Sequence, residues 1–505
     1  MKLHSRNSPP QEIELKLCLP SPDSEGLAKC LALTPLLAQY KAAQQSLYNI
    51  YYDTPSQDLR QQRVALRLRR VGDEAKPQWL QTLKTGASDV SALSRRGEWE
   101  TSVAGPALDL DALKRTPWAD IDQGGSLFES LRPCFVTIFE RTIWSVHRHD
   151  GSCVELALDI GHIEANGKLA PICELELELK AGLPTALFEI AREIAHAVAV
   201  LPANQSKAQR GFLLAQDSLG LPQRAQTPRL MSAWTRSELA QAVLREMFAQ
   251  FINNLNAFRL SDEPEVVHQA RIGWRRFKSG LRLFRKTVAV APVPSWLELQ
   301  PLLLCLGALR NLEVALTETL PPLSAGYSMR DAQREASWQI LITALTQTAE
   351  LQREAARREL QKPNVGASLL AISEWLENLS AVGDTGSAQK GLLRHWAKRR
   401  ILRLHRQLAL AQKDATTLEH QHRVRIFAKR LRYGVEALHD LLPKRLAGFC
   451  YEQAANLQSS IGVSRDLSQA SVLVAMLDLD HDIAAFLRGV AVGSNLPSPF
   501  VPPLP

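Results

Sequence analysis

The sequence contains little cysteine: seven residues among 505, which form neither a CxxC pair nor any cluster with the spacing of zinc ligands. An odd number of scattered cysteines excludes a disulfide scaffold and predicts reduced thiols, which are typical of a cytoplasmic protein. No apolar run reaches about 18 residues, so we expect no membrane-spanning helix and no membrane partner. The first ten residues, MKLHSRNSPP, lack the apolar segment of a signal peptide and are expected to form a disordered lead.

The length of the chain predicts two or more domains, because a single hydrophobic core stops growing near about 250–300 residues. Hydrophobic residues make up 45% of the sequence, which is enough to build such cores. The formal net charge is +8 and is unevenly spread. From Leu230 onward there are 34 basic and 25 acidic residues, a net of +9, whereas the preceding part has a net of −1. The excess predicts a polyanionic partner for the C-terminal half.

A stretch near the N-terminus, residues 11–19, reads QEIELKLCL and alternates apolar with polar residues, as a β-strand with two unlike faces does. Its polar face carries Glu12, Glu14 and Lys16. A second stretch, CELELELK at residues 173–180, repeats the pattern with three glutamates. Two such strands in one site would crowd like charges, which is unfavourable unless a cation neutralises them. An ordinary surface strand shows the same alternation, so the first stretch alone leaves both interpretations open.

Further stretches of the first 216 residues alternate in the same way, and many place basic or acidic side chains on one face. We predict about eight antiparallel strands that form a barrel with a polar lumen, because lumen and exterior positions alternate along a barrel strand. Helices are expected between some of the strands, at residues 25–40 and 184–200. Besides the N-terminal strand, the predicted strands span residues 46–52, 63–71, 78–85, 95–103, 134–149, 152–163 and 169–180.

The mixed charges on the predicted lumen face have a chemical meaning. Opposed charges inside a barrel cost free energy unless ligands and metals occupy the site. Carboxylates suit a hard cation such as Mg²⁺ or Mn²⁺, and arginine and lysine suit phosphate oxygens. The combination therefore indicates a site for a multiply charged anion bound together with divalent cations.

Residues 11–216 resemble the CYTH family, also called triphosphate tunnel metalloenzymes. The motifs that carry the resemblance are QEIELKL, which matches the ExExK signature, and then YYDTP, ALRLRR, QTLK, RRGEWE, VELALDIG, PICELELELK and SKAQRGF, in the family's order. The resemblance implies an eight-stranded antiparallel tunnel that is open at both ends. It also implies hydrolysis of inorganic triphosphate, hydrolysis of thiamine triphosphate or class IV adenylyl cyclisation.

By this resemblance, particular residues are expected to act in the site. The expected metal ligands, for one or two Mg²⁺ or Mn²⁺ ions, are Glu12, Glu14, Asp159, Glu176 and Glu178. The residues expected to bind phosphate oxygens are Lys16, Arg67, Arg69, Lys84, Arg141, Lys207 and Arg210. Secondary candidates are Arg96, Glu98, Glu100, Glu155 and Glu174. No general base can be assigned.

The character of the chain changes after residue 216. Residues 217–231 are rich in proline, glycine and polar residues and are predicted to be a linker. Residues 232–490 lose the strand alternation and are predicted to form a second, all-α domain of long helices, so that the fold class is α+β. Two of these helices are expected at residues 446–460 and 467–487. The remainder, residues 491–505, is expected to be a disordered tail.

The helical half contains an internal repeat. HQARIGWRRFKSG from His268 and HRVRIFAKRLRYG from His422 are related by an offset of 154 residues. LGALRNLEVA and IGVSRDLSQA form a second pair, offset by 155, in which Asn311 stands where the other copy has Asp466. We therefore predict two related helical bundles.

In each copy, histidine and basic residues recur at helical spacing and share one face. This half resembles the CHAD domain, which implies polyphosphate binding, although family members usually have aspartate at the position of Asn311. A solvated basic face, a histidine metal site and nucleic-acid binding remain alternatives; the last lacks a reader motif and has few aromatic residues. The predicted polyphosphate-binding residues are His268, Arg271, Arg275, Arg276, Lys278, Arg282, His422, Arg425, Lys429, Arg430 and Arg432.

Together these patterns predict an enzyme that hydrolyses tripolyphosphate to diphosphate and phosphate, with a helical domain that binds inorganic polyphosphate. The phosphate-chain-binding half favours an inorganic substrate. Alternatives within enzymes are a thiamine triphosphatase and an adenylyl cyclase, each of which would need a wall for an organic ring. An alternative outside enzymes is a polyphosphate-binding scaffold, against which the acidic strands argue because anion binding alone does not need carboxylates.

Overall fold

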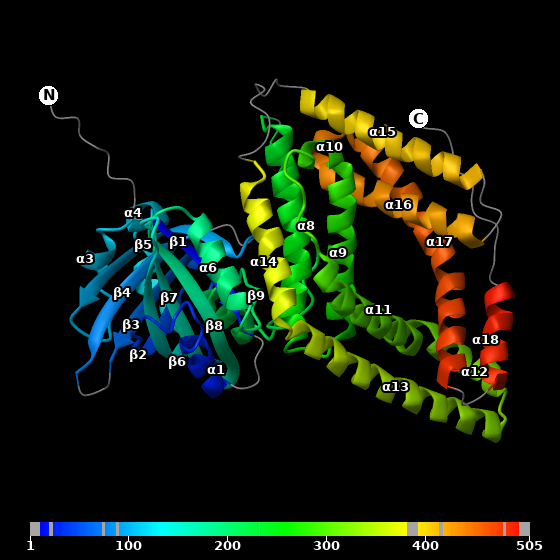
Figure 1. Cartoon of the computed structure of the whole chain (residues 1–505), viewed down its shortest axis with the longest axis horizontal. Coiled ribbons are helices and arrows are strands. Elements are labelled where there is room, and N and C mark those ends of the chain that lie inside the picture. The colour runs from blue at the N-terminus through cyan, green and yellow to red at the C-terminus, as the bar shows by residue number, and fades with distance from the viewer. Residues whose placement is uncertain are drawn as a thin grey trace. The chain divides into compact units, whose positions relative to one another are not determined.

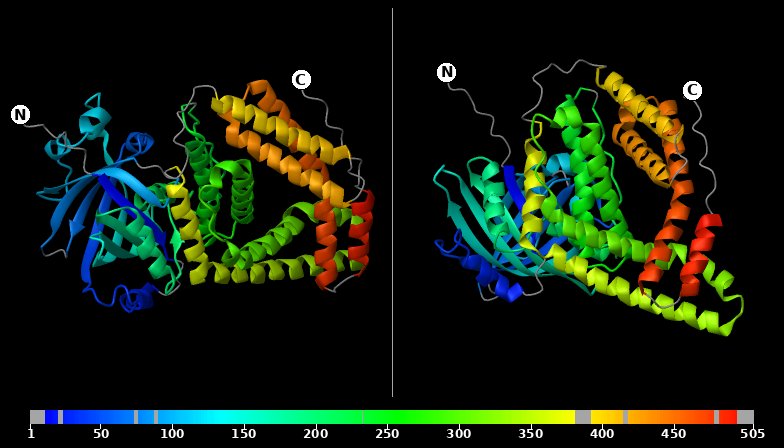
Figure 2. Two further views of the ribbon diagram at one scale, coloured as in Figure 1. Left: turned by 45° about the horizontal axis from the view of Figure 1, so that its top comes forward. Right: turned by 45° about the vertical axis from the view of Figure 1, so that its right-hand side comes forward.

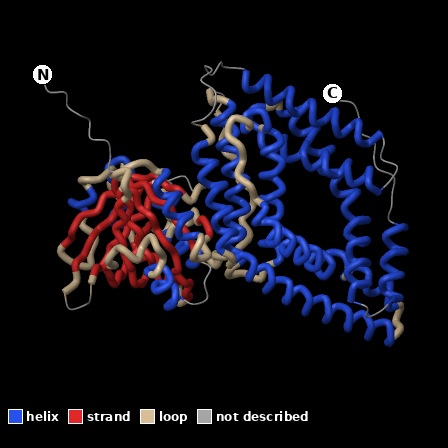
Figure 3. The backbone as a smooth tube through the Cα atoms, in the orientation of Figure 1, coloured by secondary structure: helices blue, strands red, loops and turns tan. Residues whose placement is uncertain are grey.

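The computed structural model describes residues 11–19, 24–72, 76–86, 90–231, 233–380, 392–413, 418–477 and 481–493. The predicted lead at 1–10 and most of the predicted tail lie outside the described residues. The chain divides into two compact units, which we call the barrel unit and the helical unit. The barrel unit comprises Met1–Leu221, Arg259–Ser261 and Gln361–Glu374. The strands gather in the barrel unit, and helices make up the helical unit (Figure 3).

The barrel unit is built on eight antiparallel strands that close on themselves. Their order is β5-β4-β3-β2-β6-β7-β8-β1, and β1 also pairs with β5, which completes the barrel (Figures 1 and 2). This arrangement confirms the predicted barrel. The strands are β1 (Gln11–Cys18), β2 (Ala43–Asp53), β3 (Val64–Val71), β4 (Gln78–Thr85), β5 (Leu93–Val103), β6 (Arg132–His147), β7 (Cys153–Ala165) and β8 (Lys168–Ala181), and a short β9 (Leu201–Pro202) pairs with β1.

The outward faces of the strands form the main cores of this unit. Leu15 and Leu17 of β1, with Leu175 and Leu177 of β8, are fully buried beneath helices that cover that side. A second core covers the outer face of β3 and β4. The helices over the first core are α1 (Ser24–Ala32) and α6 (Thr185–Ala195), and those over the second are α2 (Asp58–Gln61), α3 (Leu110–Leu113), α4 (Trp118–Ile121) and α5 (Leu127–Ser130).

The helix predicted at residues 25–40 is shorter in the structure. It ends at Ala32, because Pro35 lacks the N–H of a helical turn and disfavours helix in the residue before it. Thr34 donates its hydroxyl to the carbonyl of Leu31, and the chain continues in turns. The helix predicted at 184–200 likewise ends early, at Ala195.

The helical unit contains the helices from Arg236 onward, apart from Gln361–Glu374, which belongs to the barrel unit. Its aromatic core packs Phe248 and Phe251 against Trp274 and Phe277. Gly273 allows this close packing, since a Cβ there would lie 2.6 Å from the backbone N of Phe251. From Arg236 the elements are α8 (Arg236–Phe258), α9 (Pro264–Leu283), α10 (Arg285–Val288), η1 (Leu297–Leu299), α11 (Gln300–Val314), the π-helical η2 (Ala315–Thr319), η3 (Pro321–Leu323), α12 (Ser324–Ser328), α13 (Ala332–Leu360), α14 (Pro363–Asn378), α15 (Leu392–Lys413), α16 (Leu418–Leu438), η4 (His439–Leu441), α17 (Lys444–Leu477) and α18 (His481–Gly493).

The prediction of two separate helices near the C-terminus needs correction. The helices expected at 446–460 and 467–487 are instead one continuous helix, α17, followed by α18. A single interior glycine, Gly462, costs a helix only about 1 kcal/mol, and the buried residues Leu457 and Leu467 continue the apolar face past it. Leu297–Thr319 is long and apolar enough to cross a membrane by length and composition alone, with mean hydropathy 1.3 and 39% of the window buried.

Candidate active site

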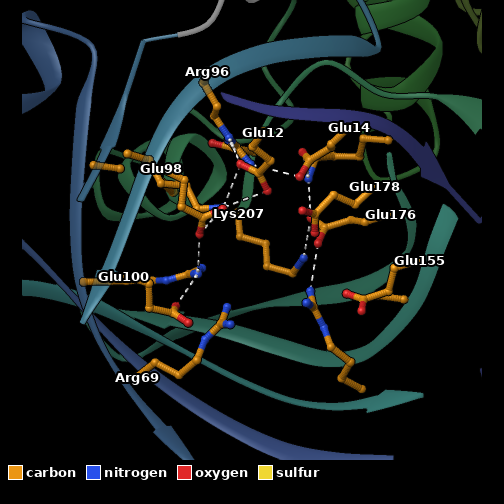
Figure 4. Close-up of a pocket in the computed structure, with 18 of the residues that line it drawn as sticks. Glu12, Glu14, Arg69, Arg96, Glu98, Glu100, Glu155, Glu176, Glu178 and Lys207 are labelled. Carbon is orange, nitrogen blue, oxygen red and sulfur yellow. Dashed lines mark hydrogen bonds and ion pairs between the residues drawn. The ribbon is translucent and has the colours of Figure 1, made fainter. Parts of the chain in front are cut away.

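A cavity of about 450 Å³ lies in the lumen of the barrel and is lined mainly by charged side chains (Figure 4). Strand alternation puts these residues there, because each shares a face with its neighbours two positions away. The lining carboxylates are Glu12, Glu14, Glu98, Glu100, Glu155, Glu176 and Glu178. The lining basic residues are Lys16, Arg67, Arg69, Lys84, Arg96, Arg141, Lys180 and Lys207.

Arg96 ties together the two glutamates of the N-terminal strand. It lies opposite Glu12 in the β1–β5 register. Its Nε donates to Glu12 Oε2 at 2.7 Å, and its Nη2 donates to Glu14 Oε2 at 3.0 Å. The two glutamates are 9% and 3% exposed, so these pairs are shielded from water. Such charge-assisted bonds fix the direction of both carboxylates.

Lys84 and Arg67 hold the carboxylates of β5. The Nζ of Lys84 lies 3.0 Å from Glu12 and 2.9 Å from Glu98. Burial and the neighbouring Arg96 lower the pKa of Lys84, despite these two carboxylates. Arg67 donates to Thr82 at 3.3 Å and lies 3.7 Å and 3.9 Å from Glu98 and Glu100. At these longer distances the Arg67 guanidinium keeps donors available for another anion.

Three carboxylates form a deep cluster around one ammonium group. Oxygens of Asp159, Glu174 and Glu176 lie within 4.8 Å of one another, a spacing at which they could hold a metal ion. The Nζ of Lys207 contacts all three, at 2.6 Å from Asp159 and 2.9 Å from Glu176. Burial alone would lower the pKa of Lys207. The attraction of the three carboxylates outweighs the effect of burial, so the pKa lies above its usual value. In this structure Lys207 shares the neutralisation of the three carboxylates with Lys16, Arg141 and Arg210.

Asp159 lies behind the cavity wall rather than in it. It is fully buried, and it accepts two hydrogen bonds of 2.7 Å from Arg141. Glu174 is also buried, and Arg210 lies 3.0 Å from it. Of the residues expected in the site, the structure thus places Asp159, Glu174 and Arg210 outside the cavity lining and brings all the others together.

A row of three carboxylates runs across neighbouring strands, from the buried Glu14 to the more exposed Glu178 and Glu155. Glu14 lies opposite Glu178 in the β1–β8 register, and Glu155 lies opposite Glu178 in the β7–β8 register. Lys180 lies 2.7 Å from Glu178 and 3.7 Å from Glu155. Burial raises the pKa of Glu178 in spite of Lys180, and Glu12 and Glu155 raise it further. Lys16 and Arg96 compensate Glu14, whereas Glu178 and Glu155 share the single charge of Lys180.

Arg69 differs from the other lumen cations. Its Nε donates to Asn49 Oδ1 at 2.8 Å, and no described carboxylate lies within 4.0 Å of its guanidinium. Burial, with the nearby charges of Arg67 and Arg141, lowers its pKa to about 10. A half-buried cation with no described carboxylate at ion-pair distance is a natural anchor for a phosphate.

Sequence reasoning missed seven lining residues: Gln11, Tyr51, Ala65, Ala157, Lys180, Ser206 and Ala208. Signals existed for two of them. Lys180 follows Glu178 by two positions and so shares its face, and Tyr51 belongs to an alternating stretch. Ser206 caps a helix whose presence the sequence analysis did not recognise. That helix, α7 (Lys207–Ala215), begins with a capping box in which the Ser206 hydroxyl accepts from the backbone N–H of Gln209.

In the helical unit, basic side chains from several helices influence one another. Burial and the charges of Arg275, Arg425 and Arg465 lower the pKa of Lys429 to about 7. Burial and a similar set lower the pKa of Arg271 to about 10. No described carboxylate lies within 4.0 Å of Arg271, Arg275, Arg425 or Lys429, and two buried guanidinium nitrogens of Arg425 have no hydrogen-bond partner. We call Arg271, Arg275, Arg425, Lys429 and Arg465 the basic cluster.

The other residues predicted for this surface lie elsewhere or are engaged locally. Arg276 is buried, donates to Gln250 at 2.7 Å and lies 3.5 Å from Glu436. Arg432 lies 3.4 Å from the same Glu436. Arg430 stacks over Phe427, at 5.1 Å.

Lys278 and Arg282 lie on α9, and both are at least partly exposed. Burial, and next the positive charge of Arg282, lower the pKa of Lys278. His268 is half-buried; burial and the charge of Arg310 lower its pKa to about 4, so it is neutral at ordinary pH. His422 is exposed on α16. His268 therefore adds no positive charge to the basic cluster.

Comparisons with known proteins agree with this arrangement. Residues 10–212 match the CYTH domain model, and residues 242–475 match the CHAD domain model. An inorganic triphosphatase from Haemophilus influenzae is 35% identical over 211 residues, which are 40% of this chain and 55% of that protein. The chain thus spans about half the length of that curated relative.

Two solved structures are also similar. The CHAD domain from the plant Ricinus communis is 28% identical, with a TM-score of 0.46, and the match covers 54% of this chain and 90% of that one. A putative adenylyl cyclase from Hippeastrum, described as having a dominant triphosphatase activity, is 18% identical, with a TM-score of 0.30, over 41% of this chain and 95% of that one. From the two domain matches, the chain is a CYTH domain followed by a CHAD domain.

Proposed function

We propose that the barrel cavity hydrolyses inorganic triphosphate to diphosphate and phosphate in the presence of Mg²⁺ or Mn²⁺. The observation that carries this proposal is the lining of the cavity, in which eight basic side chains converge with seven carboxylates. The name of the Haemophilus influenzae relative supports the same reaction. Phosphoryl transfer depends on positioning and charge neutralisation, and this cavity offers groups for both.

The charge of the cavity fits a metal ion as a third component. Its lining has a formal net charge of only +1, whereas tripolyphosphate carries about four negative charges near neutral pH. Glu14, Glu155 and Glu178 would hold a hard cation, since their row is under-compensated and offers only oxygen ligands. A bound divalent cation supplies neutralisation of phosphate charge and activation of water.

The basic residues would then orient the phosphate chain. Arg69 has no ion-pair partner among the described carboxylates. Arg67 lies more than 3.5 Å from Glu98 and Glu100. Both arginines can therefore turn guanidinium donors toward phosphate oxygens. Lys84 of β4 and Lys16 of β1 add positive charge to the cavity lining. Asp159 would position Arg141 and Lys207 from behind rather than bind metal itself.

The lining favours an inorganic substrate over an organic triphosphate. Among the described residues around the cavity, Tyr51 is the single aromatic one, and its ring already stacks on Phe135 at 4.7 Å. An adenine or thiamine ring would find no second aromatic face there. A scaffold that only binds anions would not need seven carboxylates in the same cavity, so the enzymatic reading is the stronger one.

The decisive experiment measures phosphate release by the full chain from tripolyphosphate, ATP and thiamine triphosphate, each with Mg²⁺, with Mn²⁺ and with a chelator. We expect tripolyphosphate to be hydrolysed fastest and only with metal. Faster turnover of an organic triphosphate would identify a nucleotide or thiamine enzyme. Binding without turnover of all three would identify a scaffold.

For the helical unit we propose binding of inorganic polyphosphate by the basic cluster. Support comes from its uncompensated charges, since repulsion among such cations is relieved by a polyanion. Asn311 and Asp466 make the two repeats unequal next to this cluster. We also propose a cytoplasmic location, in keeping with the seven free thiols.

A further inference from the structure

Helix α15 has two faces of opposite character. Its buried side chains recur every three or four residues and therefore share one face. They are Leu393, Ala397, Ile401, His405 and Leu408. This face packs into the helical unit, where His405 Nε2 lies 3.0 Å from Gln453 Oε1 of α17, and α15 lies alongside α16 at the edge of the unit (Figure 1). The opposite face of α15 consequently points to solvent.

The solvent face of α15 forms a continuous line of exposed residues, which we call the outer stripe. Its members follow one another at intervals of three or four positions: Leu392, His395, Arg399, Arg403, Arg406, Leu410 and Lys413. The two leucines, Leu392 and Leu410, are 56% and 62% exposed. At about 1.5 Å per residue they lie about 27 Å apart along the helix, with three arginines between them. The outer stripe thus combines cations with apolar side chains that no other part of the described protein covers.

The positive charge of α15 is not compensated by the helix itself. Its sequence holds seven lysine and arginine residues and no acidic residue. Besides those of the outer stripe, Arg394 and Lys398 are exposed on its flank. Among the described residues, no carboxylate lies within 4.0 Å of any of these seven side chains. Charge of one sign on an exposed helix face predicts a partner of the opposite sign.

The turn between α9 and α10 adjoins this positive surface. Arg400 of α15 donates its Nη2 to the carbonyl oxygen of Arg282 at 2.7 Å. Burial, and next the charges of Arg403 and Arg285, lower the pKa of Arg400, so cations of both elements lie near it. The exposed basic residues of the turn are Arg282, Arg285 and Lys286. The positive surface is therefore broader than one helix.

We infer that the outer stripe of α15 binds the surface of a bilayer that contains anionic phospholipids. The cations would attract the phosphate headgroups, and Leu392 and Leu410 would enter the boundary between headgroups and acyl chains, so that α15 lies in the plane of the surface. The sequence led us to expect no membrane partner. That expectation depended on the length of apolar runs, which a peripheral contact does not need.

The exposed leucines favour a membrane over a nucleic acid. A nucleic-acid backbone attracts cations, but it offers Leu392 and Leu410 no apolar contact. Single-stranded bases stack on aromatic rings, and the outer stripe contains no Phe, Tyr or Trp. The outer stripe is also distinct from the basic cluster, because α15 turns its other face toward α16, which carries Arg425 and Lys429.

The first test mixes the full-length protein with vesicles of phosphatidylcholine, or of phosphatidylcholine and phosphatidylglycerol in equal parts, and measures the protein that sediments with them. We expect binding to the mixed vesicles alone. Reversal of four outer-stripe charges to glutamate, at Arg399, Arg403, Arg406 and Lys413, should lower the affinity at least about 10²-fold, since each basic residue near an anionic surface contributes about fivefold.

A matched control makes the same change in net charge at four exposed residues of α13, α17 and α18: Arg358, Lys444, Arg445 and Arg488. This variant should keep most of the wild-type affinity for the mixed vesicles. Equal losses in the two variants would overturn the inference, because attraction would then follow net charge rather than the outer stripe. Failure of the wild-type protein to bind the mixed vesicles would overturn it directly.

The second test replaces Leu392 and Leu410 together by alanine, which keeps both the charge and the helix propensity. Thermal unfolding first shows that the variant is folded. Its affinity for the mixed vesicles should fall about tenfold, as expected for the loss of two partly inserted leucines. Its affinity for a random-sequence RNA duplex should not change. Unchanged vesicle affinity in this variant, with RNA binding that is lost in the variant with four reversed charges, would identify a nucleic-acid surface and overturn the inference.

Discussion

Glu14 of β1 lies directly opposite Glu178 of β8 in the antiparallel register. Like charges at opposed positions destabilise a sheet, and the row is extended by Glu155. Lys180 is the nearby positive charge that pairs with Glu178 and Glu155. The barrel therefore keeps an electrostatic cost in its free state that a bound cation would relieve.

This cost predicts the behaviour of Glu178→Gln. Metal-dependent tripolyphosphate hydrolysis should fall by at least about 10²-fold, on the scale of losing a key electrostatic contact. The metal-free variant should be no less stable than wild type, because burial and like charges oppose ionisation of Glu178. Steady-state kinetics across a metal titration measure the activity, and thermal unfolding in the presence of a chelator measures the stability of the metal-free protein. Glu129→Gln on the exposed surface is the matched control, and an active Glu178→Gln would remove this residue from the metal site.

Arg69→Lys tests whether the guanidinium of Arg69 binds phosphate oxygens of the substrate. A lysine keeps the charge but loses the planar fork, so we expect the Michaelis constant for tripolyphosphate to rise about tenfold. Arg70→Lys is the control, since the next residue faces the other side of β3 and stacks over Tyr48 at 5.2 Å. Equal kinetics of Arg69→Lys and wild type would show that Arg69 does not touch the substrate.

Lys207→Met removes the ammonium from the deep carboxylate cluster. Breaking a buried charge set in this way costs about 3–5 kcal/mol in the free energy of unfolding. Added Mg²⁺ or Mn²⁺ should restore part of that stability, because Asp159, Glu174 and Glu176 then offer a metal-sized gap. Denaturant unfolding with and without metal measures the effect. In the exposed control Lys168→Met, neither change is expected; a Lys207→Met protein insensitive to metal would contradict the prediction.

Charge reversal tests the basic cluster. Replacing Arg271, Arg275, Arg425 and Lys429 by glutamate in the full chain should abolish polyphosphate binding and leave tripolyphosphate hydrolysis unchanged. Wild-type affinity should fall steeply with salt, as counterion release requires of a polyanion complex. A control with the same change in net charge reverses four exposed residues of α15: Arg394, Lys398, Arg399 and Arg403. Equal loss of binding in both variants, or tighter binding of duplex DNA, would argue for non-specific attraction instead.

Lys429 should make polyphosphate binding depend on pH. Its pKa of about 7 in the free protein means that the ammonium loses its proton as the pH rises through neutrality. The facing arginines, Arg275, Arg425, Arg432 and Arg465, stay charged over that range. Bound polyphosphate stabilises the ammonium, so affinity should fall up to about tenfold per pH unit above 7. Lys429→Arg should flatten the dependence measured by titration at pH 6–9; an unchanged slope would exclude Lys429.

Much of the barrel could be predicted because alternation is written directly in the sequence. Each run that alternates became a strand, and the face that carries Glu12, Glu14 and Lys16 became the lumen. The register across strands could not be predicted, because it depends on pairings between residues far apart in the chain, such as Leu17 with Pro202. Alternation alone puts Glu178 and Glu174 on one face, and only the family resemblance ranked Glu178, which faces the cavity, above Glu174, which lies behind it.

The location of Phe135 and Phe139 was also invisible in the sequence. Both read as ordinary core positions, and only the closed barrel shows that they share a face with Arg141. The short helix α7 has few residues and a weak period, so its role could not be inferred from propensity alone. In the helical half, the repeat located the basic residues, but packing decided that Arg276 turns inward to Gln250.

The pairing of β1 with β8 has a consequence for biosynthesis. Lys16 meets Glu176, its register partner, only after 160 further residues have been made, which takes roughly 10–30 s at ribosomal speeds. Throughout that time one edge of β1 lacks its partner strand and is a template for pairing with other chains. The alternating charges of Glu12, Glu14 and Lys16 discourage such pairing. The residues that build the site thus also guard the nascent chain against aggregation.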